Sequence, residues 1–240
     1  MSLDKLITTC VCGNKDYFLK NRLHDIDVLE CVKCHVVHQL LLGYDENRYL
    51  DFYRTEYHEQ FQESKKVITY KERYDHDKNV AKKRLDAYLE FIEPGMKGLD
   101  IGSSNSAFVH EANSMGFKFM GLEPGDHIGD DAVTIRGTLQ SVELETEYYD
   151  VVTMHDSIEH MVDVVSALKK VKKILKDQGM LIVDLPDYFD PSGYHHWKQI
   201  EHIWFFTRDQ FIQLLNKYNF IVEMITRPIP GKLVYYMRKV

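Results

Sequence analysis

The chain has 240 residues, of which 44% are hydrophobic, so it can bury the core of one sizeable domain beside a small appendage. Its formal net charge of -7 argues against a nucleic-acid backbone as the main partner. No apolar run is long enough to span a bilayer and the first residues carry no signal-peptide pattern, so we expect a cytoplasmic protein without a membrane partner.

All four cysteines lie near the start of the chain in two close pairs, Cys10-x-Cys12 and Cys31-x-x-Cys34. In a cytoplasmic protein such cysteines are more often thiolates than disulfides. Two pairs on either side of a short β-hairpin suit tetrahedral coordination of zinc, and four thiolates leave no open position for chemistry. We therefore predict a structural zinc site in residues 1–43. Because the first pair is one residue shorter than a regular knuckle, free thiols or a lapsed site is the alternative.

Residues 44–77 are polar and rich in tyrosine, with several tyrosines four residues apart, as on one face of a helix. We interpret this stretch as a helical connector that packs on the following domain, with a lid over a bound ligand as the alternative. The next stretch, Lys78 to Ile92, carries apolar residues at helical spacing and is predicted to form an amphipathic helix. Pro94-Gly95 ends this helix before the first core strand.

Gly98 to Gly125 has the pattern of a strand, a tight turn, a helix and a second strand. Small residues from Gly102 to Asn105 form the turn, and Gly116 ends the helix. Glu123 then stands at the tip of the second strand. Such a β-α-β unit brings the backbone close to a ligand at the carboxyl end of the sheet, and an acidic residue at this tip can accept hydrogen bonds from both hydroxyls of a ribose.

The alternation of strands and helices continues to the end of the chain. Strands are predicted over Val133–Ile135, Asp150–Asp156, Met180–Leu185, Phe220–Ile225 and Leu233–Met237, and helices from Val164 to the residues before Gly179 and over Arg208–Tyr218. Thr207 is expected to cap the last helix. The segment 187–206 is expected to be a loop, dense in histidine and aromatic residues, that recognises a substrate on the ligand face of the sheet.

The stretch from Asp100 to Glu123 resembles the first nucleoside-binding motif of class I S-adenosylmethionine-dependent methyltransferases: strand, acidic-x-Gly-x-Gly-x-Gly, helix, strand, acidic. Asp100, Gly102 and Glu123 match this motif. Ser104 and Ser106 stand in place of the second and third glycines, and serine brings a Cβ and loses free access to positive φ.

A second part of the chain, ending in Glu159-His160, resembles another signature of small-molecule methyltransferases, and the resemblance is continuous from about Val80 onward. It implies a methyltransferase domain over residues 78–240 with a Rossmann-like α/β sheet, helices on both faces and an antiparallel last strand. The zinc-knuckle hairpin would stand beside this domain.

The resemblance also implies where S-adenosylmethionine binds. The cofactor-binding residues are expected to be Asp100, Gly102, Ser103, Ser104, Asn105, Glu123, Pro124, Thr138, Leu139, His155 and Asp156. Thr138 and Leu139 would lie along the adenine edge. If residues 44–77 form a lid, Tyr70 and Arg73 would lie near the methionine carboxylate.

We predict methyl transfer to a small molecule such as a sugar, a sugar nucleotide or a related biosynthetic intermediate. Displacement at the sulfonium needs the two reactants held in line, and a hydroxyl acceptor needs a base. Oxygen is favoured as the acceptor atom because histidine bases are plentiful. His202 is the first candidate, because Glu201 beside it can orient its ring, and His160 is the second. A purely structural role for each histidine is the alternative.

Two other classes of function stay open. One is a zinc-bearing binding protein whose cofactor pocket is vestigial. The other is an RNA or protein methyltransferase that uses the cysteine module for recognition. The negative charge and the lack of a basic stripe around the cysteines argue against the latter. The sequence does not indicate an oligomeric state.

Overall fold

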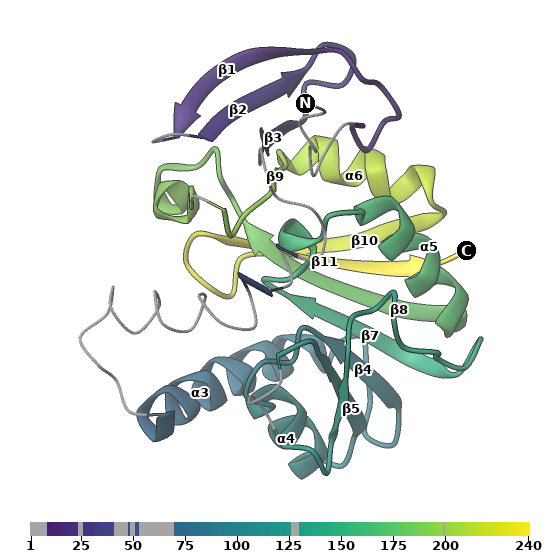
Figure 1. The fold of residues 1–240 in the computed structure, drawn as a ribbon. Coiled ribbons are helices and arrows are strands. Elements are labelled where there is room, and N and C mark those ends of the chain that lie inside the picture. Colours follow the sequence, from purple (N-terminus) through teal and green to yellow (C-terminus); the bar gives the residue numbers. More distant parts are fainter. Residues whose placement is uncertain are drawn as a thin grey trace.

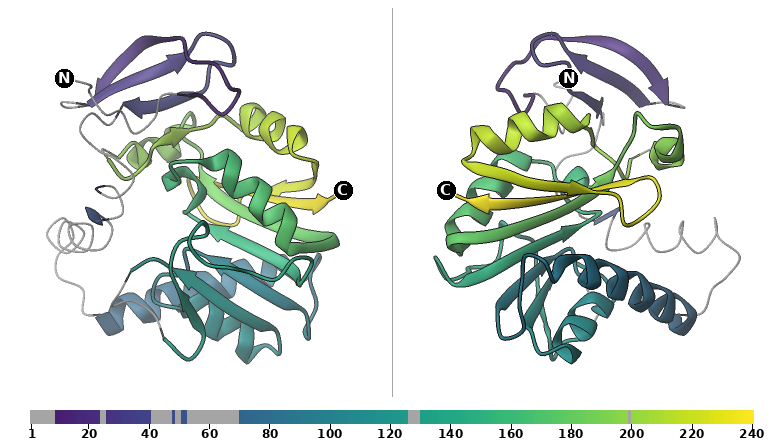
Figure 2. Two further views of the ribbon diagram at one scale, coloured as in Figure 1. Left: turned by 45° about the vertical axis from the view of Figure 1, so that its right-hand side comes forward. Right: turned by 180° about the vertical axis from the view of Figure 1, so that it is seen from behind.

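The computed structural model describes residues 9–23, 26–40, 48, 51–52, 70–125, 130–198 and 200–240. These residues build a seven-stranded sheet covered by helices and a smaller four-stranded sheet at one end of the molecule (Figures 1 and 2). The tyrosines predicted to line a connector at positions 44, 49, 53 and 57, and the side chain of Tyr70, lie outside the described part.

The large sheet has the strand order β10-β11-β8-β7-β4-β5-β6. Its strands are β4 (Lys97–Ile101), β5 (Lys118–Glu123), β6 (Thr134–Arg136), β7 (Tyr149–His155), β8 (Leu175–Pro186), β10 (Phe220–Thr226) and β11 (Lys232–Lys239). The strands β6, β5, β4, β7 and β8 pair in parallel, whereas β11 is antiparallel to both β8 and β10, which confirms the predicted antiparallel last strand. The strand order reverses beside β4, which is where ligands bind in open α/β sheets.

Helices cover both faces of this sheet (Figure 1). They are α3 (Tyr70–Tyr88), α4 (Ala107–Ser114), α5 (Val164–Ile174) and α6 (Arg208–Lys217), with two 3₁₀ turns, η1 (Ile158–His160) and η2 (Pro191–His196). Residues of α3 and α4 pack in one buried cluster, and residues of α5 and α6 pack in another. Along β8, Leu181 and Val183 face the second cluster and Ile182 faces the first, as the alternation of side chains in a strand requires. Thr207 caps α6 as predicted.

Two helices differ from the prediction. The helix α3 spans Tyr70–Tyr88 rather than Lys78–Ile92, so its first two turns belong to the stretch interpreted as a helical connector. In the other case α5 ends at Ile174 and β8 begins at Leu175, well before the predicted Met180. Leu175 is fully buried opposite Tyr149 of β7, so packing there favours strand over helix.

The small sheet contains β1 (Tyr17–Leu23), β2 (Ile26–Cys31), β3 (Val37–Leu40) and β9 (Trp204–Phe205), all antiparallel. The hairpin between the two cysteine pairs is therefore confirmed. The prediction that residues 187–206 form a loop without a strand was wrong at β9, which pairs with β3 across most of the chain. The N-terminal module thus shares a sheet with the segment expected to recognise the substrate.

Candidate functional site

A cavity of about 440 Å³ opens at the carboxyl ends of β4, β5 and β7. All the residues predicted to bind the cofactor line it, from Asp100 through the turn to Asp156, and so do both candidate catalytic histidines. Arg73 and Asp77 of α3 line the same cavity. The structure therefore gathers into one space residues that the sequence places more than a hundred positions apart.

The turn after β4 keeps the backbone shape of a glycine turn although it contains two serines. Gly102, Ser104 and Ser106 all have positive φ angles, of 79°, 47° and 61°. For serine this conformation costs about 1–2 kcal/mol. The hydroxyl of Ser106 offsets part of this cost, because its Oγ lies 2.8 Å from Thr134 Oγ1 and accepts a hydrogen bond from the Asp130 N–H at 3.0 Å. At Gly102 an added Cβ would come within 2.9 Å of Ser157 Cβ, so this position has no room for a side chain.

Glu123 closes the turn from the tip of β5. Its carboxylate accepts hydrogen bonds from the N–H groups of Ser104 at 2.8 Å and Gly125 at 2.9 Å. Burial raises the pKa of this carboxyl above its usual value, although the two N–H groups act in the opposite direction. The side chain is therefore fixed against the turn and borders the cavity.

Asp100 and His155 line the cavity and contact each other. Asp100 Oδ1 accepts from Thr153 Oγ1 at 2.7 Å and lies 2.9 Å from His155 Nδ1. The other ring nitrogen, Nε2, lies 3.0 Å from the hydroxyl of Tyr88. With Nδ1 protonated, His155 donates to Asp100 and accepts from Tyr88, so it orients the carboxylate of Asp100 in β4.

Asp156 lies in a partly buried group of charges that the sequence analysis did not find. Its carboxylate pairs with Lys232 Nζ and, at 3.3 Å, with Arg84 Nη2. The Arg84 guanidinium also binds Asp184 Oδ2 through Nε at 2.7 Å. Burial by itself raises the pKa of Asp156, but Lys232 and Arg84 outweigh it and hold the pKa well below its usual value. Arg84 lies in α3, and Lys232 is the first residue of β11. Neither residue belongs to a sequence motif from which this group of charges could have been predicted.

His160 and His202 face each other on the opposite side of the cavity. Their ring centroids are 4.6 Å apart with the planes at 88°. His160 Nδ1 donates to the main-chain oxygen of Glu201 at 2.6 Å, and His202 Nδ1 lies 2.7 Å from the Tyr188 hydroxyl. The expectation that the Glu201 side chain orients His202 was wrong, because that carboxylate binds Lys198 Nζ and Tyr188 holds the ring instead. Burial lowers the pKa of both histidines, that of His202 well below its usual value.

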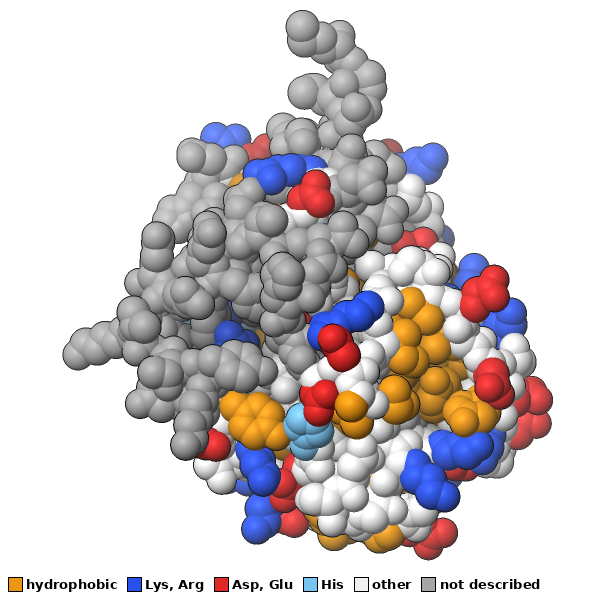
Figure 3. All heavy atoms as spheres, turned by 60° about the horizontal axis from the view of Figure 1, so that its bottom comes forward, with side chains coloured by type: hydrophobic (Ala, Val, Ile, Leu, Met, Phe, Trp, Pro, Cys, Tyr) orange, Lys and Arg blue, Asp and Glu red, His pale blue; other side chains and the backbone are white. Residues whose placement is uncertain are grey.

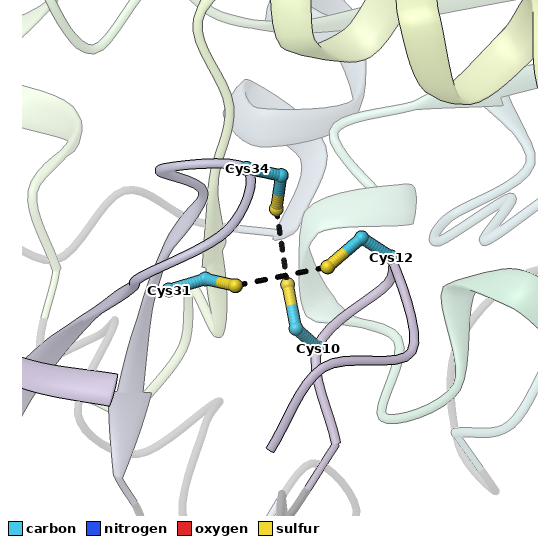
Figure 4. A group of neighbouring side chains, drawn as sticks. All are labelled: Cys10, Cys12, Cys31 and Cys34. Carbon is cyan, nitrogen blue, oxygen red and sulfur yellow. Dashed lines mark hydrogen bonds between the residues drawn. The ribbon is translucent and has the colours of Figure 1, made fainter. Parts of the chain in front are cut away.

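The four cysteines converge from the loop before β1 and the turn after β2 (Figure 4). Cys10 Sγ lies 3.4 Å from Cys34 Sγ, Cys12 Sγ lies 3.7 Å from Cys31 Sγ, and all four sulfurs lie within 4.8 Å of one another. Zinc–sulfur bonds of 2.3 Å in a tetrahedron place sulfurs about 3.8 Å apart. The N–H of Lys33 also donates to Cys31 Sγ at 3.4 Å. The residues present therefore fit a tetrahedral metal ion.

Comparisons with known proteins bear on the larger domain. A family model described as a methyltransferase domain matches residues 72–224. No curated protein matches the sequence. None of the described helices is both long and apolar enough to cross a membrane.

Several solved structures share the fold. A methyltransferase of Thermotoga maritima, described as S-adenosylmethionine-dependent and a possible histamine N-methyltransferase, has 23% identity and a TM-score of 0.53, covering 67% of this chain and 89% of that one. The magnesium protoporphyrin IX methyltransferase of Synechocystis PCC 6803, solved with S-adenosylhomocysteine bound, has 10% identity and a TM-score of 0.60, covering 82% of this chain and 100% of that one. An S-adenosylmethionine-dependent methyltransferase from Mesorhizobium loti has 15% identity and a TM-score of 0.54, covering 65% and 98%.

Proposed function

The chain belongs to the methyltransferase-domain family and is an S-adenosylmethionine-dependent methyltransferase, and we propose that it methylates an oxygen atom of a small molecule such as a sugar, a sugar nucleotide or a related biosynthetic intermediate. The observation that carries this proposal is the single cavity that joins the glycine-like turn to the pair of histidines. One end of this cavity suits a nucleoside and the other suits an acceptor with polar groups.

The turn and the tips of β5 and β7 are proposed to hold the cofactor. Glu123 is buried and fixed by two backbone N–H groups, so its carboxylate is preorganised to accept hydrogen bonds from ribose hydroxyls. Asn105 Nδ2 donates to Asp77 Oδ2 at 2.7 Å, which ties the turn to α3 and places the polar first turns of that helix beside it. Thr138 and Leu139 border the same space and suit the edge of a base. The bound cofactor supplies an activated methyl group on its sulfonium, so no covalent enzyme intermediate is needed.

His202 and His160 are proposed to act on the acceptor. Both rings are neutral, because burial lowers their pKa values, so each can accept a proton or a hydrogen bond from a hydroxyl. Tyr188 fixes the His202 ring, and the Glu201 carbonyl fixes the His160 ring. Because both rings are held in place at the acceptor end, they support the proposal that positioning of the acceptor provides most of the rate of methyl transfer.

The cysteine cluster is proposed to bind a structural zinc ion. Four sulfurs at nearly tetrahedral spacing support this, and they leave no open position for a substrate. The ion would fix the turn after β2, which leads into β3. Reduced thiols of this kind agree with a cytoplasmic location, which we propose for the protein.

The alternatives find less support. In a vestigial pocket we expect side chains to fill the space at the turn, whereas the cavity here is open. For an RNA or protein acceptor we expect a patch of one charge sign. On the described part of the face formed around α3 and α4, acidic and basic side chains are interspersed (Figure 3).

The proposed function is tested by methyl transfer from labelled S-adenosylmethionine into fractionated cell extract. Label in the small-molecule fraction supports the proposal, and label confined to RNA or protein overturns it. The His202→Asn variant should lose most turnover while its affinity for S-adenosylhomocysteine stays within about twofold, because the ring lies at the acceptor end. Unchanged turnover in this variant would exclude His202 from the reaction.

A further inference from the structure

Glu159, in η1, carries a carboxylate that is fully buried, and neither of its oxygens has a hydrogen-bond partner among the described residues. Asp156 and His160, which are close to it in sequence and line the cavity, both have partners of their own. An ionised carboxylate buried in this way costs several kcal/mol unless a positive charge or hydrogen-bond donors face it. None of the residues that the structure describes donates such a hydrogen bond to Glu159.

Two imidazoles lie next to this carboxylate. Ligand atoms of Glu159, His160 and His202 all lie within 4.8 Å of one another. Each imidazole is held at Nδ1, by the Glu201 carbonyl in one case and by the Tyr188 hydroxyl in the other. A partner at one ring nitrogen that fixes the ring is the usual outer shell of a metal-bound histidine.

We propose that Glu159, His160 and His202 form a second metal site, for a divalent transition-metal ion, at the wall of the acceptor half of the cavity, which the two histidines line. Two imidazoles and one carboxylate suit Mn²⁺, Fe²⁺ or Zn²⁺ and leave coordination positions open, unlike the four thiolates of the N-terminal module. The positive ion also supplies the charge that the Glu159 carboxylate lacks.

This site deepens the proposed function and rests on it. A hydroxyl oxygen bound to a divalent ion loses its proton more readily, so the proton can pass to solvent, and His160 and His202 then act on the acceptor through the ion that they bind. The acceptor oxygen then forms its bond to the methyl carbon as the carbon–sulfur bond of the sulfonium breaks. The products are the methyl ether, neutral S-adenosylhomocysteine and one proton.

The test is a count of metal by mass spectrometry after the purified chain is loaded with zinc and freed of weakly bound ions. We expect two zinc ions per chain in the wild type and one in Glu159→Gln, which keeps the shape of the side chain and removes its charge. The matched control is His196→Gln, because His196 lines the same cavity outside the three ligands, and this variant should keep both ions. One zinc ion per chain in both the wild type and Glu159→Gln would overturn the proposal.

A second measurement tests the metal site even if the Glu159→Gln variant does not fold. Mn²⁺ prefers oxygen and nitrogen ligands to thiolates, so its paramagnetic resonance signal reports this site and not the cysteine module. The wild type should bind one Mn²⁺ ion with no acceptor present, and His202→Gln should weaken binding at least tenfold. Absence of Mn²⁺ binding by the wild type overturns the metal site. Because neither measurement needs turnover, failed methyl transfer by a metal-loaded enzyme would count against the proposed function alone.

Discussion

The side chain of Gln39 donates a hydrogen bond from Nε2 to the main-chain oxygen of His202 at 2.8 Å, although the two residues are 163 positions apart. The same amide donates to Lys198 O at 2.5 Å and accepts from Ile200 N–H at 2.9 Å. The Gln39 N–H donates to Ile203 O at 2.9 Å, next to the pairing of β3 with β9. One buried glutamine of the N-terminal module therefore fixes the backbone of the segment that carries His202.

Replacing Gln39 with Ala should disturb the acceptor end of the cavity and spare the cofactor end. Three backbone groups lose their partner, one of them buried and two partly buried, which should lower the free energy of unfolding by about 2–3 kcal/mol. We expect kcat/KM for methyl transfer to fall about tenfold or more, while calorimetry shows an almost unchanged affinity for S-adenosylhomocysteine. Gln213→Ala, on the exposed face of α6, is the control and should change neither quantity. Equal losses of cofactor binding and turnover in Gln39→Ala would contradict this division of the site.

Removal of metal from the cysteine module should affect the acceptor end of the cavity through the bonds that Gln39 of β3 makes to the segment carrying His202. A strong chelator or Cys31→Ser should release zinc, loosen the turn between β2 and β3, and lower Tm by more than about 5 °C. Turnover should fall more than the affinity for the cofactor does, because Gln39 of β3 bonds to Lys198, His202 and Ile203 at the acceptor end. Zinc analysis combined with a thermal melt checks this. A chain that contains no zinc and still melts at the same temperature would show that the cysteines do not stabilise the fold through a metal.

The two serines of the turn should respond in opposite ways to glycine. Ser104 has a positive φ, and the only hydrogen bond found for it in the described residues comes from its backbone N–H, so Ser104→Gly should raise the free energy of unfolding by about 0.5 kcal/mol. Ser106 also has a positive φ, but its hydroxyl bonds to Thr134 and to the Asp130 N–H. Losing both bonds outweighs the relief of strain, so Ser106→Gly should lower the free energy of unfolding by about 1 kcal/mol. Denaturant unfolding of the two variants measures the difference, and a stabilised Ser106→Gly would refute this account of the turn.

The affinity for S-adenosylhomocysteine should depend on pH through Glu123. Burial raises the folded-state pKa of this carboxyl, the nearby Asp100 raises it further, and Arg136 and the N–H groups of Gly125 and Ser104 lower it. Only the carboxylate can accept bonds from both ribose hydroxyls, so affinity should be constant above this raised pKa and should fall as the pH decreases through it. Calorimetry at a series of pH values measures the effect. In Glu123→Gln the acid-dependent loss should disappear, and a loss of the same size in that variant would assign the titration to another group.

Much of the large sheet could be predicted because its signals are local. The buried strand before Gly102, the small residues of the turn and the acid at Glu123 are contiguous, and the apolar spacing of α5 and α6 repeats over several turns. The two cysteine pairs likewise lie on either side of one hairpin. In each case the residues that make the structure are close in sequence.

What could not be predicted depends on contacts between distant segments. The strand β9 has only two residues, too few for a periodic pattern, and its partner β3 lies at the other end of the chain. Tyr188 rather than Glu201 orients His202, since tertiary packing decides which neighbour reaches the ring. The Glu159 carboxylate lacks a hydrogen-bond partner among the described residues and lies beside two imidazoles, which is visible only once η1 is packed against the segment that carries His202.

The most direct test of the account is calorimetric binding of S-adenosylhomocysteine to the wild type and to Glu123→Gln at neutral pH. The account predicts that the wild type binds one molecule per chain. The variant should bind about 10- to 100-fold more weakly, since hydrogen bonds to a charged acceptor contribute about 1.5–3 kcal/mol. Absence of binding by the wild type, or equal affinity in the two proteins, would contradict the claim that the ribose of the cofactor rests on this carboxylate.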